Sequence, residues 1–316
     1  MNENLITVLA GGVGAARFLQ GLVKIMPPEK VTVIVNTGDD IELYGLHISP
    51  DIDIIAYTLA GIVDEEKGWG IRGDTFNCLE TLSKYGHKTW FKLGDRDLAT
   101  HIQRTNLLKS GFTLSEATAE ICQRLGVIPK ILPMTNDKFE TRIVTDKGTM
   151  HFQEYLVKRG AQDRVNGVLF NGAEKAKPAP EALESILNAD SIIICPSNPI
   201  VSIGTILAVK GVKNALKQTE ANVVAVSPIV GGRPIKGPAD KLMHGLGLEV
   251  SAYSVAKLYC EFLDVFVIDQ VDRREKKRIE GLGLNVVATN TIMKNLEDKV
   301  HLARVTLKAV QPEWLT

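Results

Sequence analysis

The amino-acid sequence predicts an α/β protein with a doubly wound, mostly parallel, Rossmann-like sheet and a smaller inserted α/β-rich cap region. Short β-branched runs alternate with longer segments that carry apolar residues at helical spacing. These runs are continuously apolar rather than alternating, which is typical of strands covered by helices on both faces. Most runs end in a polar loop that contains glycine or proline. In a doubly wound sheet, ligands bind at these carboxyl ends of the strands.

The first strand–helix–strand unit lies near the N-terminus. Residues 5–9 form an apolar run that leads into a glycine loop, and the apolar positions between 17 and 26 have helical spacing. Two consecutive prolines end that helix. Residues 31–35 predict the next strand. A parallel pair with a right-handed crossover is therefore expected.

The second half of the chain repeats this pattern. Four more apolar runs predict strands, at residues 191–195, 223–226, 265–268 and 285–288. The middle of the chain differs, because short runs at 131–134, 141–145, 150–155 and 165–169 follow one another with turn signals between them. We therefore assign residues 1–110 and 171–316 to a nucleotide-binding core and residues 111–170 to the inserted cap.

A helix is expected ahead of these middle strands. Thr113 and Glu116 have the spacing of a capping box, in which the two side chains satisfy each other's backbone N–H groups. The helix would run to Leu125, and Gly126 is a suitable stop.

Composition excludes several classes of protein. The chain has 316 residues, with 37 Lys and Arg against 37 Asp and Glu, and 45% of its residues are hydrophobic. Disordered chains lack this hydrophobicity, and general nucleic-acid binders usually carry a basic excess. No apolar run is long enough to span a membrane. Four scattered cysteines without a C-x-x-C pair, and the lack of a signal peptide, predict a cytoplasmic protein with reduced thiols.

The glycine loop is the first candidate site. Gly11, Gly12, Val13 and Gly14 lie between the first strand and its helix. Glycines there let the backbone approach a phosphate, and the helix N-terminus supplies N–H donors. A tight turn would also use glycines. The loop is not the dinucleotide fingerprint, because Arg17 stands where a third glycine is required.

Acidic residues follow the second strand. Asp39 and Asp40 would hold a ribose, touch a metal or cap the loop. Asp51 and Asp53, in a segment that also holds His47, would bind a divalent cation or act as a base. The alternative for either aspartate is a helix N-cap.

Three more polar segments complete the set. Residues 92–101 combine Lys92, Asp95, Arg96, Asp97 and His101, which is unusually dense for a surface loop. His101 and Arg104 would share a helix face at i, i+3. Residues 196–204 and 227–232 are rigid loops after predicted strands, suited to reading a base or a phosphate, and residues 235–241 add Lys236 and Lys241.

Taken together, these segments resemble the 2-phospho-L-lactate transferase family of deazaflavin coenzyme F420 biosynthesis. The matching stretches run in the family's order and cover nearly the whole chain: the glycine loop, Ile48–Asp53, Trp69–Ile71, Lys92–His101, Met150–Gln153, Pro196–Pro199, Ser227–Ile229, Leu263–Val267 and Asp272–Arg273. The sequence departs at Val13, where the family often has threonine. That change removes a hydroxyl from the loop but leaves its N–H donors.

The resemblance implies a magnesium-dependent transferase. It would move a phospholactyl or phosphoenolpyruvyl group from a guanosine diphosphate-linked donor to the ribityl hydroxyl of the deazaflavin Fo, and release GMP. Asp51, Asp53, Asp95 and His101 are the expected catalytic residues, with Mg²⁺ on Asp51 and Asp53. The donor would contact Gly11, Gly12, Val13, Gly14, Asn36, Ser197, Asn198, Ser227 and Lys236. Fo would contact Asp53, Trp69, Lys92 and Arg96.

Other interpretations stay open. A nucleotide-sugar-binding regulator of the same superfamily would use the same glycine loop and sheet, although residues 92–97 and 150–153 match the transferase. A nicotinamide-dependent oxidoreductase rests only on the first strand–loop–helix unit. Trp69 would equally suit packing as stacking on Fo. The expected partners are the two small-molecule substrates, without nucleic acid or membrane, and a homodimer is compatible with the sequence.

Overall fold

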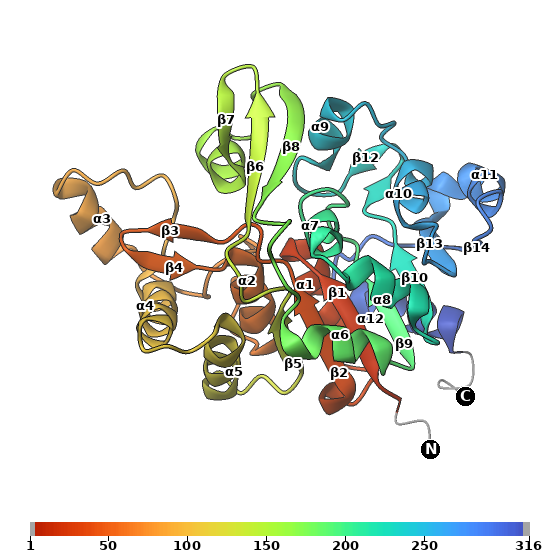
Figure 1. Ribbon diagram of the computed structural model, residues 1–316, viewed down its shortest axis with the longest axis horizontal. Helices are drawn as coiled ribbons and strands as arrows, with labels where there is room; N and C mark the ends of the chain where they lie inside the picture. The colour runs from red at the N-terminus through yellow and green to blue at the C-terminus, as the bar shows by residue number, and fades with distance from the viewer. Residues whose placement is uncertain (1–3, 312–316) are drawn as a thin grey trace.

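The computed structural model describes residues 4–311 and contains a central sheet of seven parallel strands (Figure 1). In spatial order these are β14 (Asn285–Thr289), β13 (Val265–Asp269), β10 (Asn222–Val226), β9 (Ser191–Ile194), β1 (Ile6–Ala10), β2 (Val31–Val35) and β5 (Lys130–Pro133). The predicted α/β class with a parallel sheet is confirmed.

Helices cover both faces of this sheet. One face carries α1 (Gly12–Leu22), α2 (Pro50–Leu59), α5 (Leu114–Arg124) and α12 (Leu296–Val310). The other carries α6 (Pro180–Leu187), α7 (Ile203–Ala208), α8 (Val212–Gln218), α10 (Ala252–Tyr259) and α11 (Lys276–Glu280). Successive strand residues point to opposite faces, so Val8 joins the first cluster and Leu9 the second. This explains why the strands read as continuous apolar runs.

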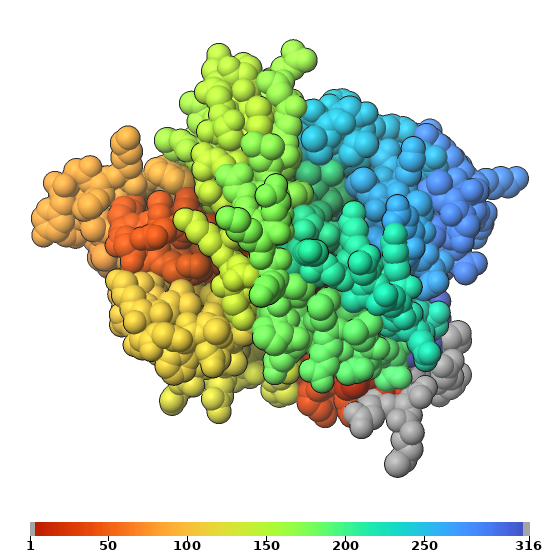
Figure 2. Space-filling view, viewed as in Figure 1, coloured from red at the N-terminus to blue at the C-terminus, as the bar shows by residue number. Residues whose placement is uncertain are grey.

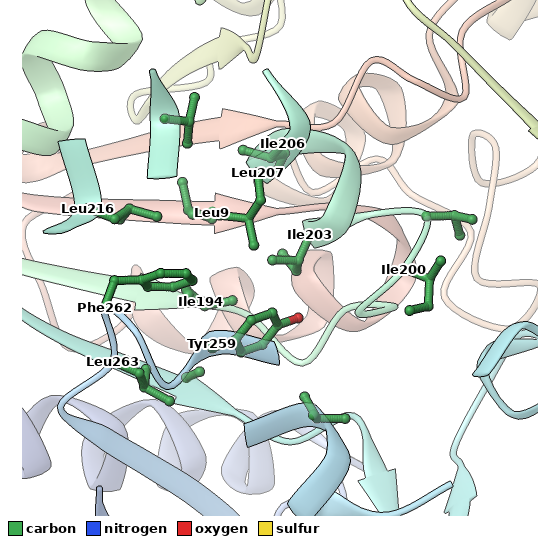
Figure 3. Packing of buried hydrophobic residues seen from close by; sticks show 14 of the residues in the cluster. Leu9, Ile194, Ile200, Ile203, Ile206, Leu207, Leu216, Tyr259, Phe262 and Leu263 are labelled. Atoms are coloured by element: carbon green, nitrogen blue, oxygen red, sulfur yellow. The ribbon is translucent and has the colours of Figure 1, made fainter. Parts of the chain in front are cut away.

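Buried side chains show how α7 and α10 pack on their face of the sheet. Leu9 of β1 and Ile194 of β9 lie under Ile203 and Ile206 of α7, and Tyr259 of α10 packs beside them (Figure 3). All five side chains are almost completely shielded from solvent. This packing fixes the segment that connects β9 to α7, which also borders the site described below.

Three small antiparallel sheets stand outside the central one. The largest consists of β7 (Gly148–His151), β6 (Glu140–Thr145) and β8 (Val165–Asn171). It projects from the body of the molecule in yellow-green (Figure 2). The others pair β3 (Ile41–Leu43) with β4 (Leu46–Ile48), and β11 (Ile229–Val230) with β12 (Arg233–Pro234).

The remaining helices lie at the periphery. They are α3 (Asn77–Lys84), α4 (Asp95–Lys109) and α9 (Ala239–Gly245), with 3-10 turns at Pro28–Lys30 and Gln270–Glu275 and a π-helical turn at Glu154–Lys158. No helix within residues 4–311 has the length and apolar character needed to cross a lipid bilayer.

The predicted insert at residues 111–170 is larger than the separate sheet. β5 pairs with β2 in parallel, so it belongs to the central sheet, and α5 packs on the same face as α1. Among the strands near the predicted insert, those that lie outside the central sheet begin only at Glu140, and the last of them ends at Asn171. The expected strand over 150–155 ends at His151, because the chain then turns into helical geometry.

The helix cap ahead of β5 is confirmed. The Thr113 side chain accepts from the backbone N–H of Glu116, and the Glu116 carboxylate accepts from the N–H of Thr113. Leu125 is the C-cap, and Gly126 follows with φ of +71°.

Candidate functional site

The strand order places a crevice in the middle of the sheet. From β1 the chain moves outward to β2 and β5 on one side, whereas β9, β10, β13 and β14 continue on the other. Adjacent strands at such a switch point send their following loops in opposite directions, which leaves room for a ligand at the carboxyl edge. A cavity of about 880 Å³ lies there. The loops after β1, β9, β10 and β14 line it, together with α2, α4 and the segment that follows β7.

Close backbone contacts shape the centre of the crevice. A Cβ atom on Gly14 would lie 2.3 Å from the carbonyl oxygen of Pro196, and one on Gly11 would lie 2.8 Å from Asp51 Oδ2. The Gly11 N–H donates to Ser197 Oγ at 3.3 Å. Gly12, with φ of +71°, begins α1. The first turn of α1 carries no acidic residue, so its N–H groups and dipole favour an anion at this point.

Asp39 and Asp51 form the carboxylate floor of the cavity. Both line it, and both are largely buried. Burial and the charge of Asp51 raise the pKa of Asp39 well above its usual value. Burial also raises the pKa of Asp51 to about 7. Asp39 Oδ1 is buried without a hydrogen-bond partner, so the floor has an unused acceptor.

Asn36 holds this floor from beneath. Its Nδ2 donates to Asp51 Oδ2 at 2.9 Å, and its Oδ1 accepts from the Gly38 N–H at 2.8 Å and from Thr205 Oγ1 at 2.7 Å. Asn36 itself is fully buried and does not line the cavity. Its geometry supports Asp51 rather than a substrate.

Asp53 belongs to a different set of contacts. It lies in the first turn of α2, whose N-cap is Ser49, so neither Asp51 nor Asp53 is the N-cap. Both oxygens of Asp53 accept from the Arg104 guanidinium. His101 lies beside this pair, with Nδ1 at 3.6 Å from Asp53 Oδ2. The i, i+3 relation between His101 and Arg104 is confirmed by a 3.3 Å contact between their nitrogens.

Cations surround the carboxylates. Arg17, Lys92, Lys236 and Lys294 line the cavity, and within residues 4–311 none of them forms an ion pair with a carboxylate. Burial and the charge of Arg17 lower the pKa of Lys236. Two cations that face each other without a counter-ion favour binding of an anion between them.

The mouth of the cavity is apolar. Trp69, Val157 and Ile235 line it although they are 40%, 41% and 53% exposed. The Lys67 ammonium lies 5.9 Å from the centre of the Trp69 ring. These side chains come from two loops and the π-helical turn Glu154–Lys158, and they give the entrance a surface suited to a flat, apolar group.

Twelve predicted site residues line this cavity: Gly11, Gly12, Val13, Gly14, Asp51, Asp53, Trp69, Lys92, His101, Ser197, Asn198 and Lys236. Ser227 and Arg96 do not. The Ser227 hydroxyl donates to the Ile229 carbonyl at 2.9 Å, and exposed Arg96 donates to the Arg72 carbonyl at 3.3 Å.

Asp95 also lies outside the cavity lining. Its carboxylate accepts from the hydroxyl of Thr75, from the backbone and side chain of Asn77, and from the N–H of Cys78. These bonds, led by that of Thr75, lower the pKa of Asp95 to about 2. The carboxylate therefore caps the start of α3.

Several lining residues were not predicted as site residues. In the sequence, Arg17 stands out only because it replaces a glycine, and Asp39 has three alternative roles, which are ribose binding, metal binding and loop capping. The segment Thr291–Lys294 was missed, although it follows the last strand at the same edge of the sheet. Its place directly after a predicted strand was the signal from which the sequence could have identified this segment. Tyr57 carried no pattern that marked it as site-forming, and Phe152 and Gln153 stood out only through the family resemblance of residues 150–153.

The fold and the cavity together define a doubly wound α/β protein whose candidate ligand site lies at the switch point of the sheet and combines a glycine loop, buried carboxylates and free cations. The chain belongs to the 2-phospho-L-lactate transferase CofD family, whose model matches residues 6–306.

Relatives of known name are similar over nearly their whole length. A phosphoenolpyruvate transferase from Streptomyces griseus is 44% identical over 312 residues, covering 97% of this chain and 98% of the relative. A 2-phospho-L-lactate transferase from Methanothermobacter thermautotrophicus is 45% identical over 305 residues, covering 96% and 98%. The crystal structure of a UPF0052 family protein from Bacillus halodurans has a TM-score of 0.63, with 17% identity and coverage of 97% and 99%. That last likeness concerns the fold alone.

Proposed function

We propose that the protein transfers a phospholactyl or phosphoenolpyruvyl group from a guanosine diphosphate-linked donor to the ribityl hydroxyl of the deazaflavin Fo and releases GMP, as a step in coenzyme F420 biosynthesis. Family membership supports the class of reaction. The observation that carries the proposal is that the glycine loop, the carboxylate floor and Asp53 all line one cavity. A diphosphate, its metal and an attacking hydroxyl would each find a matching surface there.

The donor would lie along the β9 to β14 side of the crevice. Its diphosphate would sit at the N-terminus of α1 over Gly12, where backbone N–H groups and the helix dipole favour negative charge. Arg17 and Lys236 would offset further charge on the phosphates. The loop at Ser197 and Asn198 and the segment after β14 would contact the guanosine half.

The residues present fit a divalent cation. Asp39 and Asp51 offer buried carboxylate oxygens whose pKa values are raised by burial and by charge repulsion, and a cation between them would relieve that repulsion. Over residues 4–311 no cluster of three or more acidic, His or Cys side chains forms a complete metal cage. Mg²⁺ commonly binds through one or two carboxylates and completes its shell with substrate phosphates and water. We therefore assign Mg²⁺ to Asp39 and Asp51, in place of the pair Asp51 and Asp53.

The reaction needs little covalent chemistry from the protein. The hydroxyl oxygen of Fo would bond to the phosphorus that carries the three-carbon acid, the bond from that phosphorus to the bridging oxygen of GMP would break, and the hydroxyl would pass its proton to the Asp53 carboxylate. Bound Mg²⁺ would supply charge neutralisation on the diphosphate. Asp53 would accept the hydrogen bond of the attacking hydroxyl, and Lys92 and the Trp69 surface would hold the acceptor. Catalysis then consists of positioning and charge stabilisation.

A direct test is incubation of the purified protein with Fo, Mg²⁺ and each guanosine donor in turn, with products resolved by mass. We expect Fo to gain a phospholactyl or phosphoenolpyruvyl group with one equivalent of GMP, and the more active donor identifies the acid. Calorimetry with GDP, Fo and a UDP-sugar is the companion measurement. Tight binding of the UDP-sugar without binding of GDP or Fo would replace the transferase with a nucleotide-sugar-binding regulator.

A further inference from the structure

Arg104 is a buried charge that the proposed reaction does not use directly. It lies on α4, is 0% exposed, and is the largest of the fully buried side chains in residues 4–311. Its Nη1 donates to Asp53 Oδ2 at 3.1 Å, and its Nη2 donates to Asp53 Oδ1. Both oxygens of a cavity-lining carboxylate are thus held by one planar group.

Stability alone is a poor reason for this pair. Desolvation of two charges commonly cancels their attraction, so apolar packing would stabilise the fold equally well. A bidentate guanidinium, however, fixes the plane of a carboxylate as well as its position. A fixed plane is useful where the remaining lone pairs of a carboxylate must face a reacting group, and Asp53 lines the cavity.

Further buried polar side chains lie next to Arg104. The His101 Nδ1 lies 3.3 Å from Arg104 Nη1. Because a guanidinium can only donate, Nδ1 must present its lone pair, which leaves the ring proton on Nε2. That nitrogen lies 3.3 Å from Asp97 Oδ1 without forming a hydrogen bond, and the Tyr57 hydroxyl donates to the same oxygen at 2.7 Å. Two buried hydrogen-bonded pairs, Tyr57 with Asp97 and Asp53 with Arg104, therefore join α2 to α4.

Each of the two aspartates of α2 has its own support. Asp51 is held by Asn36 and borders the glycine loop, whereas Asp53 is held by Arg104. Side chains two residues apart on a helix do not face each other. The two carboxylates are therefore directed to different parts of the cavity.

We propose that Arg104 is a positioning residue for the acceptor substrate: it orients Asp53 so that the carboxylate accepts the hydrogen bond of the attacking hydroxyl. This inference rests on the proposed function, which defines the acceptor. Arg104 does not touch the acceptor and acts only through Asp53. The donor and Mg²⁺ are bound by other residues, so their binding is independent of Arg104.

The test is steady-state kinetics of Arg104→Met and Arg104→Lys with acceptor, donor and Mg²⁺ varied separately. Methionine keeps much of the volume and removes every donor, whereas lysine keeps the charge without the planar fork. For Arg104→Met we expect kcat/KM for the acceptor to fall by about tenfold to a hundredfold, because the attacking hydroxyl loses its orientation. The KM values for donor and Mg²⁺ should stay within about twofold, and Arg104→Lys should lie between Arg104→Met and wild type.

A matched control is Asp190→Ala. Asp190 accepts from the backbone N–H of Leu5 at 2.8 Å at the opposite, amino edge of the sheet. Its loss removes a structural contact far from the cavity. We expect it to lower the Tm without changing the ratio of acceptor to donor KM values, which separates positioning from general destabilisation.

Two results would overturn the inference. One is an acceptor kcat/KM within about twofold of wild type in folded Arg104→Met, and the other is a donor KM that rises as much as the acceptor KM. If Arg104→Met does not fold, the same criteria apply to Arg104→Lys. Failure of the proposed function gives a different result, because wild-type protein would then transfer nothing to Fo from any guanosine donor.

Discussion

Gly14 and Pro196 meet where the first and second halves of the sheet adjoin, and the Pro196 carbonyl oxygen occupies the space next to the Gly14 Cα. A Cβ atom on Gly14 would lie 2.3 Å from that oxygen, which is closer than any real Cβ contact. The first turn of α1 and the loop after β9 can thus lie in direct contact only because Gly14 has no side chain. We expect the width of the crevice at this point to depend on this contact.

Gly14→Ala should therefore widen the crevice at the proposed diphosphate site. We expect a loss of about 1–3 kcal/mol in the free energy of unfolding, as for other overpacking substitutions, and a raised KM for the guanosine donor. Chemical denaturation and donor-varied kinetics measure the two effects. Gly167→Ala is the control, because its Cβ would lie 3.8 Å from the nearest atom, a normal contact. Equal free energies of unfolding and equal donor KM values for the two variants would show that neither stability nor donor binding depends on the close contact at Gly14.

Substitution of the carboxylate floor should change the dependence on metal. For Asp39→Asn and Asp51→Asn we expect the Mg²⁺ concentration that gives half-maximal activity to rise by at least about tenfold, since each removes a charged oxygen ligand. Asp53→Asn should instead lower kcat with little change in Mg²⁺ dependence. Magnesium titrations of activity decide the assignment. Near wild-type kcat in Asp51→Asn or Asp53→Asn would remove that residue from catalysis.

Stability in the absence of metal should fall as the pH rises from about 4 to about 7. In the folded protein burial raises the pKa of Asp51 from its ordinary 3.8 to about 7. Between these pH values the folded state holds a proton that the unfolded chain has lost, so stabilisation is complete at low pH and disappears toward neutrality. Urea denaturation in chelator at several pH values measures the slope.

Asp51→Asn gives the comparison for that slope. Its free energy of unfolding should depend less steeply on pH than that of wild type over the same window, because asparagine does not titrate. Identical slopes for the two proteins would show that Asp51 keeps an ordinary pKa.

Asp95 gives opposite expectations from sequence and from geometry. The sequence predicts a catalytic carboxylate, whereas the structure shows a cap for α3 with a pKa lowered to about 2 by hydrogen bonds led by that of Thr75. From the capping geometry, Asp95→Ala should lower the Tm and leave kcat within about twofold below the transition. The stabilisation by this carboxylate is present above the ordinary pKa of 3.8 and is lost as the pH falls through 2. A large loss of kcat at an unchanged Tm would restore the catalytic assignment.

Most strands of the central sheet could be predicted because each is a continuous apolar run, in most cases followed by a polar loop that contains glycine or proline. The run at 131–134 is the exception. Its apolar pattern predicted a strand, yet nothing local says which sheet a strand joins, and the short runs with turn signals that follow it suggested an insert. In the structure β5 extends the central sheet beside β2, an outcome decided by packing between distant segments.

The same limit explains which site residues were found. Glycines after a predicted strand indicate a loop at the carboxyl edge of the sheet, and the acidic residues that follow neighbouring strands can be assigned to the same edge. Whether a polar side chain faces a cavity or a backbone N–H of a distant segment depends on the tertiary structure, as the bond from the Cys78 N–H to Asp95 shows. The His101 and Arg104 relation was predictable because both lie on one helix. Their contact with Asp53 was not, because it joins two helices.

The small sheet of β6, β7 and β8 has a further consequence for how substrate selectivity can change. The segment that follows β7 supplies Phe152, Gln153, Leu156 and Val157 to the cavity wall, yet none of these residues belongs to the parallel sheet that carries the glycine loop. Val157 is 41% exposed, so we expect substitutions at this position to reshape one wall without moving the edge proposed to hold the diphosphate. That wall of the cavity can therefore change its selectivity while the glycine loop keeps its sequence.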